Sequence, residues 1–314
     1  MKYFAKKLCA LIITLFIVSL LAFLAFQVIP GDVATSKLGT NATPEQVAEL
    51  RTELGLDQPT LLRYRNWLVN FVQGDMGTSY NYHMPVSDMI SQKLPVTAVL
   101  TIIALFLSIV VSLPLGILAA RKEGGFFDRT LTVFNQIFMS IPPVFVGILL
   151  SYIFGITLKL FVPGNFVAFS DNPWQFFVAL FFPALSMAVS RIAMTVKMLR
   201  SSILHEMDQN YIRTAYSRGN SRTNAMRKHA LRNAMIPVTT FLASAAAELV
   251  AASIVIEQVF AVPGIGRLLL ASISNRDFPV VQAIVVILAT WVVAVNFIAD
   301  ILVQRMDPRI RLDD

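Results

Sequence analysis

The chain alternates between six long apolar runs and shorter polar segments. The runs cover about residues 8–29, 97–120, 131–161, 174–199, 237–259 and 278–303. Each is long enough for a helix that crosses a bilayer, which needs about 20 predominantly apolar residues. The third run has room to tilt, or to break near Pro142-Pro143. The pattern predicts an all-α membrane protein with six transmembrane helices.

The first apolar run has some features of a secretory signal peptide, because Lys2, Lys6 and Lys7 precede it. The run exceeds the roughly 7–15 apolar residues of such signals, and Ile29-Pro30-Gly31-Asp32 offers no A-x-A cleavage pattern. We therefore expect a membrane helix that remains in the chain.

The composition agrees with a membrane protein and excludes several other classes. Hydrophobic residues make up 56% of the chain and charged residues 14%, against about 25% charged residues in globular proteins. These values exclude a disordered, fibrous or nucleic-acid-binding chain, despite a pI of 9.7. A single cysteine, Cys9, excludes a disulfide framework, and the three histidines have no metal-ligand spacing.

The basic residues are distributed unequally between the two sides of the predicted membrane. Seventeen of the 26 Lys and Arg residues flank the runs on the side that holds both termini, and eight lie on the other side. Arg191 falls within the fourth run. Because cytoplasmic loops carry the excess of Lys and Arg, we expect both termini in the cytoplasm.

Residues 30–95 form a hydrophilic segment that we expect outside the cell and partly ordered. Thr43 and Pro44 suit the N-cap and first position of a helix. A second helix is indicated by an apolar stripe of Trp67, Leu68, Phe71 and Val72. Two interpretations remain open, which are a surface helix packed on the membrane-facing core and a docking surface for an external partner.

The cytoplasmic segment at about residues 200–236 has the most specific pattern. A short helix is predicted from Asn210 to Arg218, followed by Gly219, where glycine permits a left-handed C-cap. Ser221 can cap a second helix, in which alanine and methionine alternate with Arg and Lys. From the residues alone, such a basic amphipathic hairpin also suits a surface that faces lipid headgroups.

The spacing in this segment is similar to that of a known loop. Arg213-Thr214-Ala215, three residues, Gly219 and then His229 to Pro237 resemble the coupling loop of ABC-transporter permeases, in the B-type oligopeptide/dipeptide/nickel branch. The family motif begins Glu-Ala-Ala, and its Leu-Pro is here Leu231-Arg232, with the proline displaced to Pro237. Further matches are Ile29-Pro30-Gly31-Asp32, Gly74 to Ser79, Gln209-Asn210-Tyr211, Glu257 to Gly266, Arg276 to Gln282 and Asp307-Pro308-Arg309.

The resemblance implies an ABC importer type I permease fold in a bacterial inner membrane. It divides the chain into a transmembrane helix at 1–29, an external segment at 30–95 and a core permease domain at 96–314. Implied partners are a second homologous permease subunit, two cytoplasmic ATPase subunits, an external solute-binding protein and membrane lipid. The implied coupling residues are Tyr211, Ile212, Arg213, Thr214, Ala215, Arg218 and Gly219.

The absence of an ATP-binding motif from the chain agrees with this resemblance. No G-x-x-x-x-G-K-[ST] occurs in the chain, so it is not expected to be an ATPase, and ATP and Mg²⁺ would bind to the partner subunits. We expect no cofactor on this chain. The alternative class is an ion-coupled secondary transporter, which would need its own ion site and usually internal repeats.

Ionisable residues within membrane helices are candidates for function because their exposure to lipid costs several kcal/mol. Glu248 lies in a small-residue stretch near the middle of the fifth run, and with Ser244 and Ser253 it is a candidate for the substrate path. An ionised Glu248 there would favour cationic cargo. Arg191 is expected to pair or to extend towards the headgroups. The cargo itself, whether dipeptide, oligopeptide, glutathione, nickel or a metal chelate, is not defined by the sequence.

Overall fold

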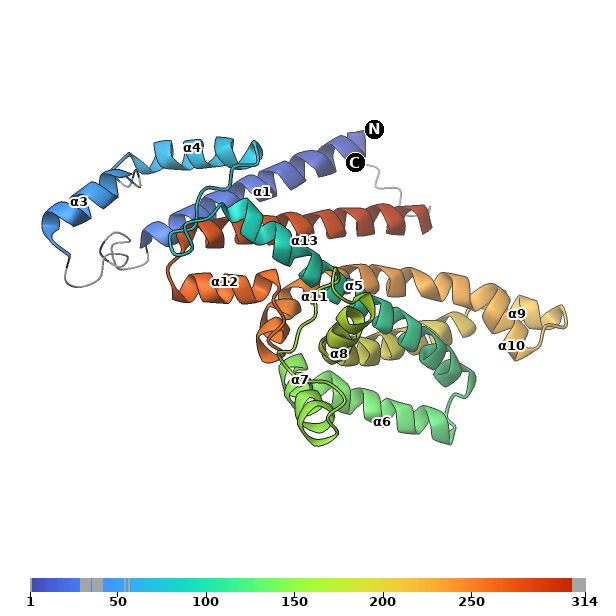
Figure 1. The fold of residues 1–314 in the computed structure, drawn as a ribbon. Helices are drawn as coiled ribbons and strands as arrows, with labels where there is room; N and C mark the ends of the chain where they lie inside the picture. The colour runs from blue at the N-terminus through green and yellow to red at the C-terminus, as the bar shows by residue number, and fades with distance from the viewer. Residues whose placement is uncertain (1, 29–34, 36–41, 54, 56, 307–314) are drawn as a thin grey trace. The chain divides into compact units, whose positions relative to one another are not determined.

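A computed structural model describes residues 2–28, 35, 42–53, 55 and 57–306 (Figure 1). Two of the motifs, Ile29-Pro30-Gly31-Asp32 and Asp307-Pro308-Arg309, lie outside the described residues. The chain forms two compact units. One consists of Met1–Val96 with Pro263–Val293, and the other of Thr97–Val262 with Ala294–Asp314.

The predicted all-α architecture with six candidate spans is confirmed. In the described part of the chain, five helices are long and apolar enough to cross a membrane, and a bent pair adds a sixth candidate if its two parts count as one span. The five are α1 (Lys2–Val28), α5 (Val86–Arg121), α8 (Pro173–Met207), α11 (Leu231–Val259) and α13 (Phe278–Met306).

The sixth candidate span is broken at the two adjacent prolines. It consists of α6 (Phe126–Ser140) and α7 (Pro143–Leu150), which continues as a π-helical turn at Ser151–Thr157. The two parts meet at an angle of 100°. Pro143 disfavours the α conformation at the preceding residue, and Pro142 is accordingly extended, with ψ 141°. Of the two possibilities for this run, a tilt or a break near Pro142-Pro143, the break is the one observed.

The helix ends differ from the ends of the apolar runs. Helix α5 begins at Val86 instead of Thr97, and α8 continues past Arg200 to Met207. Helix α11 begins at Leu231, so the prediction that Pro237 opens the fifth helix was wrong. Hydropathy marks where a helix can meet lipid, whereas a polar helical turn can continue beyond that point. Pro237 costs one backbone hydrogen bond, which membrane helices tolerate.

In the first unit, the segment at residues 30–95 contains α3 (Pro44–Glu53) and α4 (Thr60–Val72). The start of α3 is a reciprocal cap. The Gln46 N–H donates to Thr43 Oγ1 (3.3 Å), and the Thr43 N–H donates to Gln46 Oε1 (3.0 Å). The predicted helix start at Thr43-Pro44 is therefore confirmed.

The face by which α4 packs on α1 is not quite the predicted one. Its buried residue is Tyr64, whose hydroxyl lies 2.8 Å from Ser19 Oγ and whose ring contacts Phe23. Trp67 and Phe71 continue this face through ring contacts, but Val72 is 78% exposed. The predicted stripe was therefore wrong at Val72, because positions 64, 67 and 71 share the face at helical spacing.

Asp277, between α12 (Ile265–Ser274) and α13, binds the loop that contains the Gly74 to Ser79 motif. Its buried carboxylate accepts hydrogen bonds from the Ser79 hydroxyl (2.5 Å) and the Tyr80 N–H (3.0 Å). Since a buried carboxylate needs such partners, the two motifs form one structural connection within the unit.

Helix α8 is the centre of the second unit and packs against α6, α7 and α11 (Figure 1). Small buried residues on α8, including Ala184 and Ala188, allow the neighbouring helices to approach closely. Towards the end of α8, Leu199 and Ile203 form a core cluster with Val238 of α11. This packing fixes the base from which the hairpin that follows α8 extends.

Candidate coupling segment and polar face

The segment after α8 folds into the predicted hairpin. Helix α9 (Asn210–Ser217) is followed by α10 (Arg222–Ala225), and a π-helical turn at Met226–Ala230 leads into α11. Gly219 has φ +82°, and its N–H donates to the Tyr216 carbonyl (2.8 Å). Ser221 Oγ accepts a hydrogen bond from the Asn224 N–H (3.4 Å). The predicted left-handed glycine and serine cap are therefore confirmed.

Helix α9 has a buried face and an exposed face. Ile212 and Ala215 are buried, and they form a cluster with Ala225 and Ala230 of the returning chain, against which Met207 packs. The exposed side chains of the helix and its C-terminal end include Arg213, Thr214, Tyr216 and Arg218. The hairpin thus holds α9 by its apolar side and presents its polar side outward.

Tyr211 connects the start of α9 by hydrogen bonds to the C-terminal end of α8 and to the N-terminal end of α11. Its hydroxyl donates to the Glu206 carboxylate and accepts from the Asn233 side-chain amide (3.2 Å). Burial, followed by the hydrogen bond to Glu206, raises the pKa of Tyr211 to about 12. The hydroxyl therefore remains protonated at physiological pH and keeps its role as the donor.

The candidate coupling residues consequently fall into two groups. Tyr211, Ile212 and Ala215 hold α9 in place within the chain. Arg213, Thr214 and Arg218 are exposed beside Gly219, which turns the chain. Ile212 and Ala215 are buried and cannot contact another protein, whereas the second group is exposed and can.

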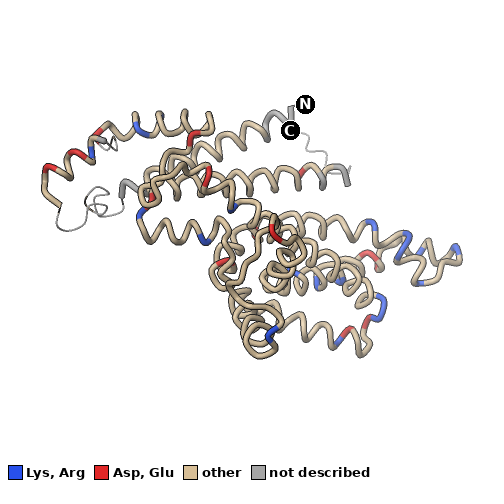
Figure 2. Tube along the Cα trace, in the orientation of Figure 1, with Lys and Arg blue, Asp and Glu red and all other residues tan. Residues whose placement is uncertain are grey.

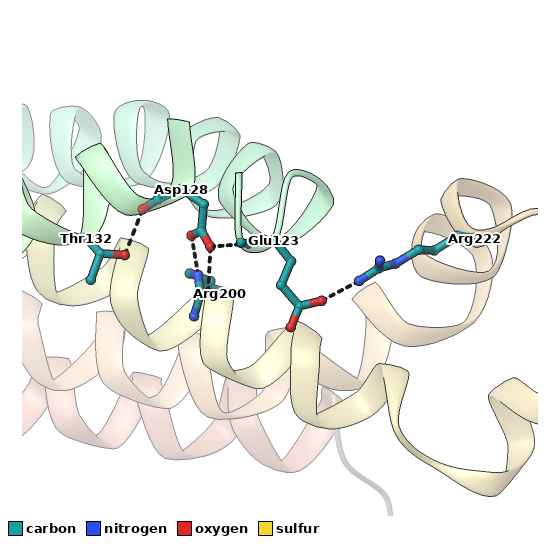
Figure 3. A network of polar contacts seen from close by, with 6 residues as sticks. Glu123, Asp128, Thr132, Arg200 and Arg222 are labelled. Carbon is teal, nitrogen blue, oxygen red and sulfur yellow. Dashed lines mark hydrogen bonds and ion pairs between the residues drawn. The ribbon is translucent and has the colours of Figure 1, made fainter. Parts of the chain in front are cut away.

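A network of ion pairs at the same end of the second unit was not found from the sequence (Figure 3). The Asp128 carboxylate of α6 accepts two hydrogen bonds from Arg200 of α8, one from Nε (2.5 Å) and one from Nη2 (2.7 Å). It accepts a third from the Gly124 N–H (2.9 Å). Glu123 pairs with Arg222 of α10 at 2.5 Å. The loop between α5 and α6 is therefore connected both to α8 and to the hairpin.

The hairpin carries a dense set of positive charges (Figure 2). Its exposed basic residues are Arg213, Arg218, Arg222, Arg227, Lys228 and Arg232. Of these, Arg222 is paired with Glu123. A surface of this kind attracts an acidic partner, either a protein or anionic lipid.

The candidate path residues lie on different sides of α11. Ser244 and Glu248 are exposed, one helical turn apart, whereas Ser253 is fully buried and its hydroxyl donates to the Val250 carbonyl. Nine residues correspond to two and a half helical turns, so Ser253 points opposite to Ser244. Ser253 therefore does not share the exposed face of the other two residues.

Glu248 forms an ion pair with Arg191 of α8, in which Arg191 Nη2 lies 2.5 Å from Glu248 Oε2. The Glu248 side chain is 56% exposed and the Arg191 side chain 20% exposed. Of the two expected arrangements for Arg191, pairing is the one observed. The carboxylate is therefore accessible, with the guanidinium behind it.

The exposed face of α11 is polar in comparison with the faces of other membrane helices. It consists of residues at helical spacing, which are Pro237, Thr240, Ser244, Glu248, Ala251, Val255 and Gln258. By contrast, the exposed residues of α5 include Ile102, Phe106 and Val110. An exposed carboxylate suits contact with water or protein better than contact with hydrocarbon.

Two family profiles match the chain. Residues 112–312 match the family described as "Binding-protein-dependent transport system inner membrane component". Residues 1–101 match the N-terminal family described as "Binding-prot-dependent transport system membrane comp, N-term". Together the two profiles cover almost the whole chain.

Similar proteins align over nearly their full lengths. A protein of Brucella abortus named as a peptide transport system permease protein is 39% identical over 308 residues, covering 98% of both chains. A peptide ABC transporter permease protein of Sinorhizobium fredii is 33% identical over 309 residues, covering 98% of this chain and 99% of the relative. The glutathione transport system permease protein of Escherichia coli K12 is 34% identical over 311 residues, covering 99% of both.

Proposed function

The chain belongs to the family of binding-protein-dependent transport system inner membrane components, and from this premise we propose how it works. It is the membrane-spanning permease subunit of an ABC importer for peptides or related small solutes. Transport proceeds by alternating access, in which the membrane helices expose the cargo path first to one side and then to the other. Two separate ATPase subunits bind and hydrolyse ATP with Mg²⁺.

The observation that carries this proposal is the two-faced structure of α9. Ile212 and Ala215 hold the helix by its buried side, and the Tyr211 hydroxyl connects it to Glu206 at the end of α8. The outward side, with Arg213, Thr214 and Arg218, docks on an acidic groove of an ATPase subunit. Because α9 is fixed to α8 and α11, movement of the ATPase subunits moves these membrane helices with it.

Three further parts of the assembly follow from the fold class. A second homologous permease subunit completes the path, and the polar face of α11 supplies one wall of it through Ser244 and Glu248. The hairpin and both termini lie in the cytoplasm, as the excess of Lys and Arg on that side supports. The segment at residues 30–95 lies outside, where a solute-binding protein delivers the cargo.

The experiment that tests the proposed function is peptide uptake into proteoliposomes that contain the permease pair, the ATPase subunits and the binding protein. We expect uptake that requires ATP on the ATPase side and persists when ionophores collapse all ion gradients. Omission of the ATPase subunits should abolish it. Uptake that follows an ion gradient without ATP would overturn the proposal in favour of secondary transport.

A further inference from the structure

The Arg191–Glu248 pair places two opposite charges on an otherwise polar, uncharged surface. Thr240 and Ser244, on the same face of α11 as Glu248, use their hydroxyls to donate to their own helix, at Ile236 and Thr240 carbonyls. These hydroxyls therefore need no outside partner. Glu248 and Arg191 are the charged groups that this part of the second unit offers to a solute.

The pair changes the electrostatic expectation for Glu248. An isolated carboxylate in a water-poor path attracts a cation strongly, because charges interact more in a low dielectric than in bulk water. With the Arg191 guanidinium at 2.5 Å, the local net charge is zero. A cation gains attraction to Glu248 but meets repulsion from Arg191, and an anion experiences the reverse.

A solute that carries both charges avoids this conflict. Glu248 uses Oε2 towards Arg191, and its 56% exposure leaves room for an ammonium group to approach the carboxylate. Arg191 has a five-donor guanidinium, and within the described residues only Nη2 is engaged by a side chain. Its side chain is 20% exposed, so part of the guanidinium is open to a carboxylate that approaches from the same side.

We propose that Arg191 and Glu248 recognise zwitterionic cargo in the path, with the cargo ammonium on Glu248 and the cargo carboxylate on Arg191. This inference rests on the proposed function and specifies its substrate class as short peptides with both termini free. An extended peptide spans at most about 3.3–3.6 Å per residue, so its two charges lie closer together the shorter the peptide is, and a di- or tripeptide that bends can bring both to one ion pair. Net-cationic solutes, which Glu248 alone would favour, are not preferred.

The test compares three cargoes of equal length in the reconstituted importer. Trialanine carries both terminal charges, N-acetyl-trialanine only the negative one, and trialanine amide only the positive one. Initial uptake rates are measured at saturating binding protein, after the affinity of the binding protein for each peptide has been determined. We expect the wild-type importer to prefer trialanine after correction for these affinities.

The single variants should shift the preference in opposite directions. Arg191→Gln leaves an uncompensated carboxylate and should raise the amide-to-acetyl rate ratio, whereas Glu248→Gln should lower it. Each shift should be about five- to tenfold, in keeping with one charge interaction in a partly hydrated site. The double variant Arg191→Gln/Glu248→Gln should transport all three peptides with similar rates.

Asp171→Asn is the matched control, because it removes one exposed negative charge from the loop before α8. It should leave all rate ratios unchanged. If both single variants slow the three peptides by the same factor, or the double variant keeps the wild-type preference, the pair only holds α8 to α11 and the inference is overturned. Absence of ATP-driven uptake of any peptide by the wild type would instead refute the proposed function.

Discussion

Replacement of Gly219 by leucine is expected to reduce ATP-driven uptake at least about tenfold, while the permease still folds. Gly219 has φ +82°, where a β-carbon strains the turn, and the leucine side chain would also push α9 away from the docked partner. A loss of about 1.4 kcal/mol of docking free energy corresponds to a tenfold change. A β-carbon at this position meets nothing within 4 Å in the chain. The added bulk therefore acts on the turn and on the docked partner, not on the core of the unit.

The measurement is the rate of uptake together with the ATP hydrolysis that liganded binding protein stimulates. Gly74→Leu is the matched control, because Gly74 also has a positive φ (+92°), has the same open space where a β-carbon would lie and belongs to the segment at residues 30–95, away from the hairpin in the sequence. It bears the same backbone strain but should keep hydrolysis coupled to uptake. Equal losses in the two variants, at equal expression, would show that strain alone accounts for the effect.

Replacement of Asp128 by alanine is expected to destabilise the second unit by about 2–3 kcal/mol. The Asp128 side chain is 4% exposed, whereas the Arg200 side chain is 30% exposed. Removal of the carboxylate therefore leaves a partly buried guanidinium and the Gly124 N–H without their partner. Hydrogen bonds to charged groups contribute about 1.5–3 kcal/mol each, and the partial exposure of Arg200 reduces the cost of its isolation.

The corresponding measurement is the unfolding temperature of the purified permease in detergent. The double variant Asp128→Leu/Arg200→Met replaces both charges with apolar groups of similar volume and should recover most of the lost stability. If the double variant is as stable as the wild type but transports peptide more slowly, the ion pair also transmits movement between α6 and α8. An Asp128→Ala variant that unfolds at the wild-type temperature would show that the contact contributes little.

The features that the sequence predicted well depend on neighbouring residues. The break at Pro142-Pro143, the reciprocal cap at Thr43 and the left-handed Gly219 each follow from the local chemistry of a few residues. The apolar runs located all six candidate spans for the same reason, since hydropathy is a property of consecutive residues.

The features that the sequence missed depend on residues far apart in the chain. Asp128 and Arg200 are separated by 72 residues, and Glu123 and Arg222 by 99. Neither pair leaves a periodic signal, because each partner is an ordinary charged residue near the end of a helix. Glu248 was recognised as unusual, but its pairing with Arg191 required the packing of α8 against α11.

Which face of α9 is buried could likewise be identified only from the tertiary structure. The sequence grouped Tyr211 to Gly219 as one coupling segment, whereas the packed hairpin separates Ile212 and Ala215 from the exposed Arg213 and Thr214. The buried cluster includes Ala225 and Ala230, which follow the turn. Helical periodicity alone indicates two faces but does not identify which face is covered.

The most direct test of the coupling role is photo-crosslinking from a benzoylphenylalanine placed at Tyr216, whose side chain is exposed on α9. Tyr82 is the matched control, an exposed tyrosine of the segment at residues 30–95, which we propose to lie outside the cell. In the assembled importer, position 216 should form an adduct with an ATPase subunit, in a yield that changes with bound nucleotide, and position 82 should form none with that subunit. An ATPase adduct at position 82, or none at position 216 in an assembled complex that hydrolyses ATP, would contradict the account.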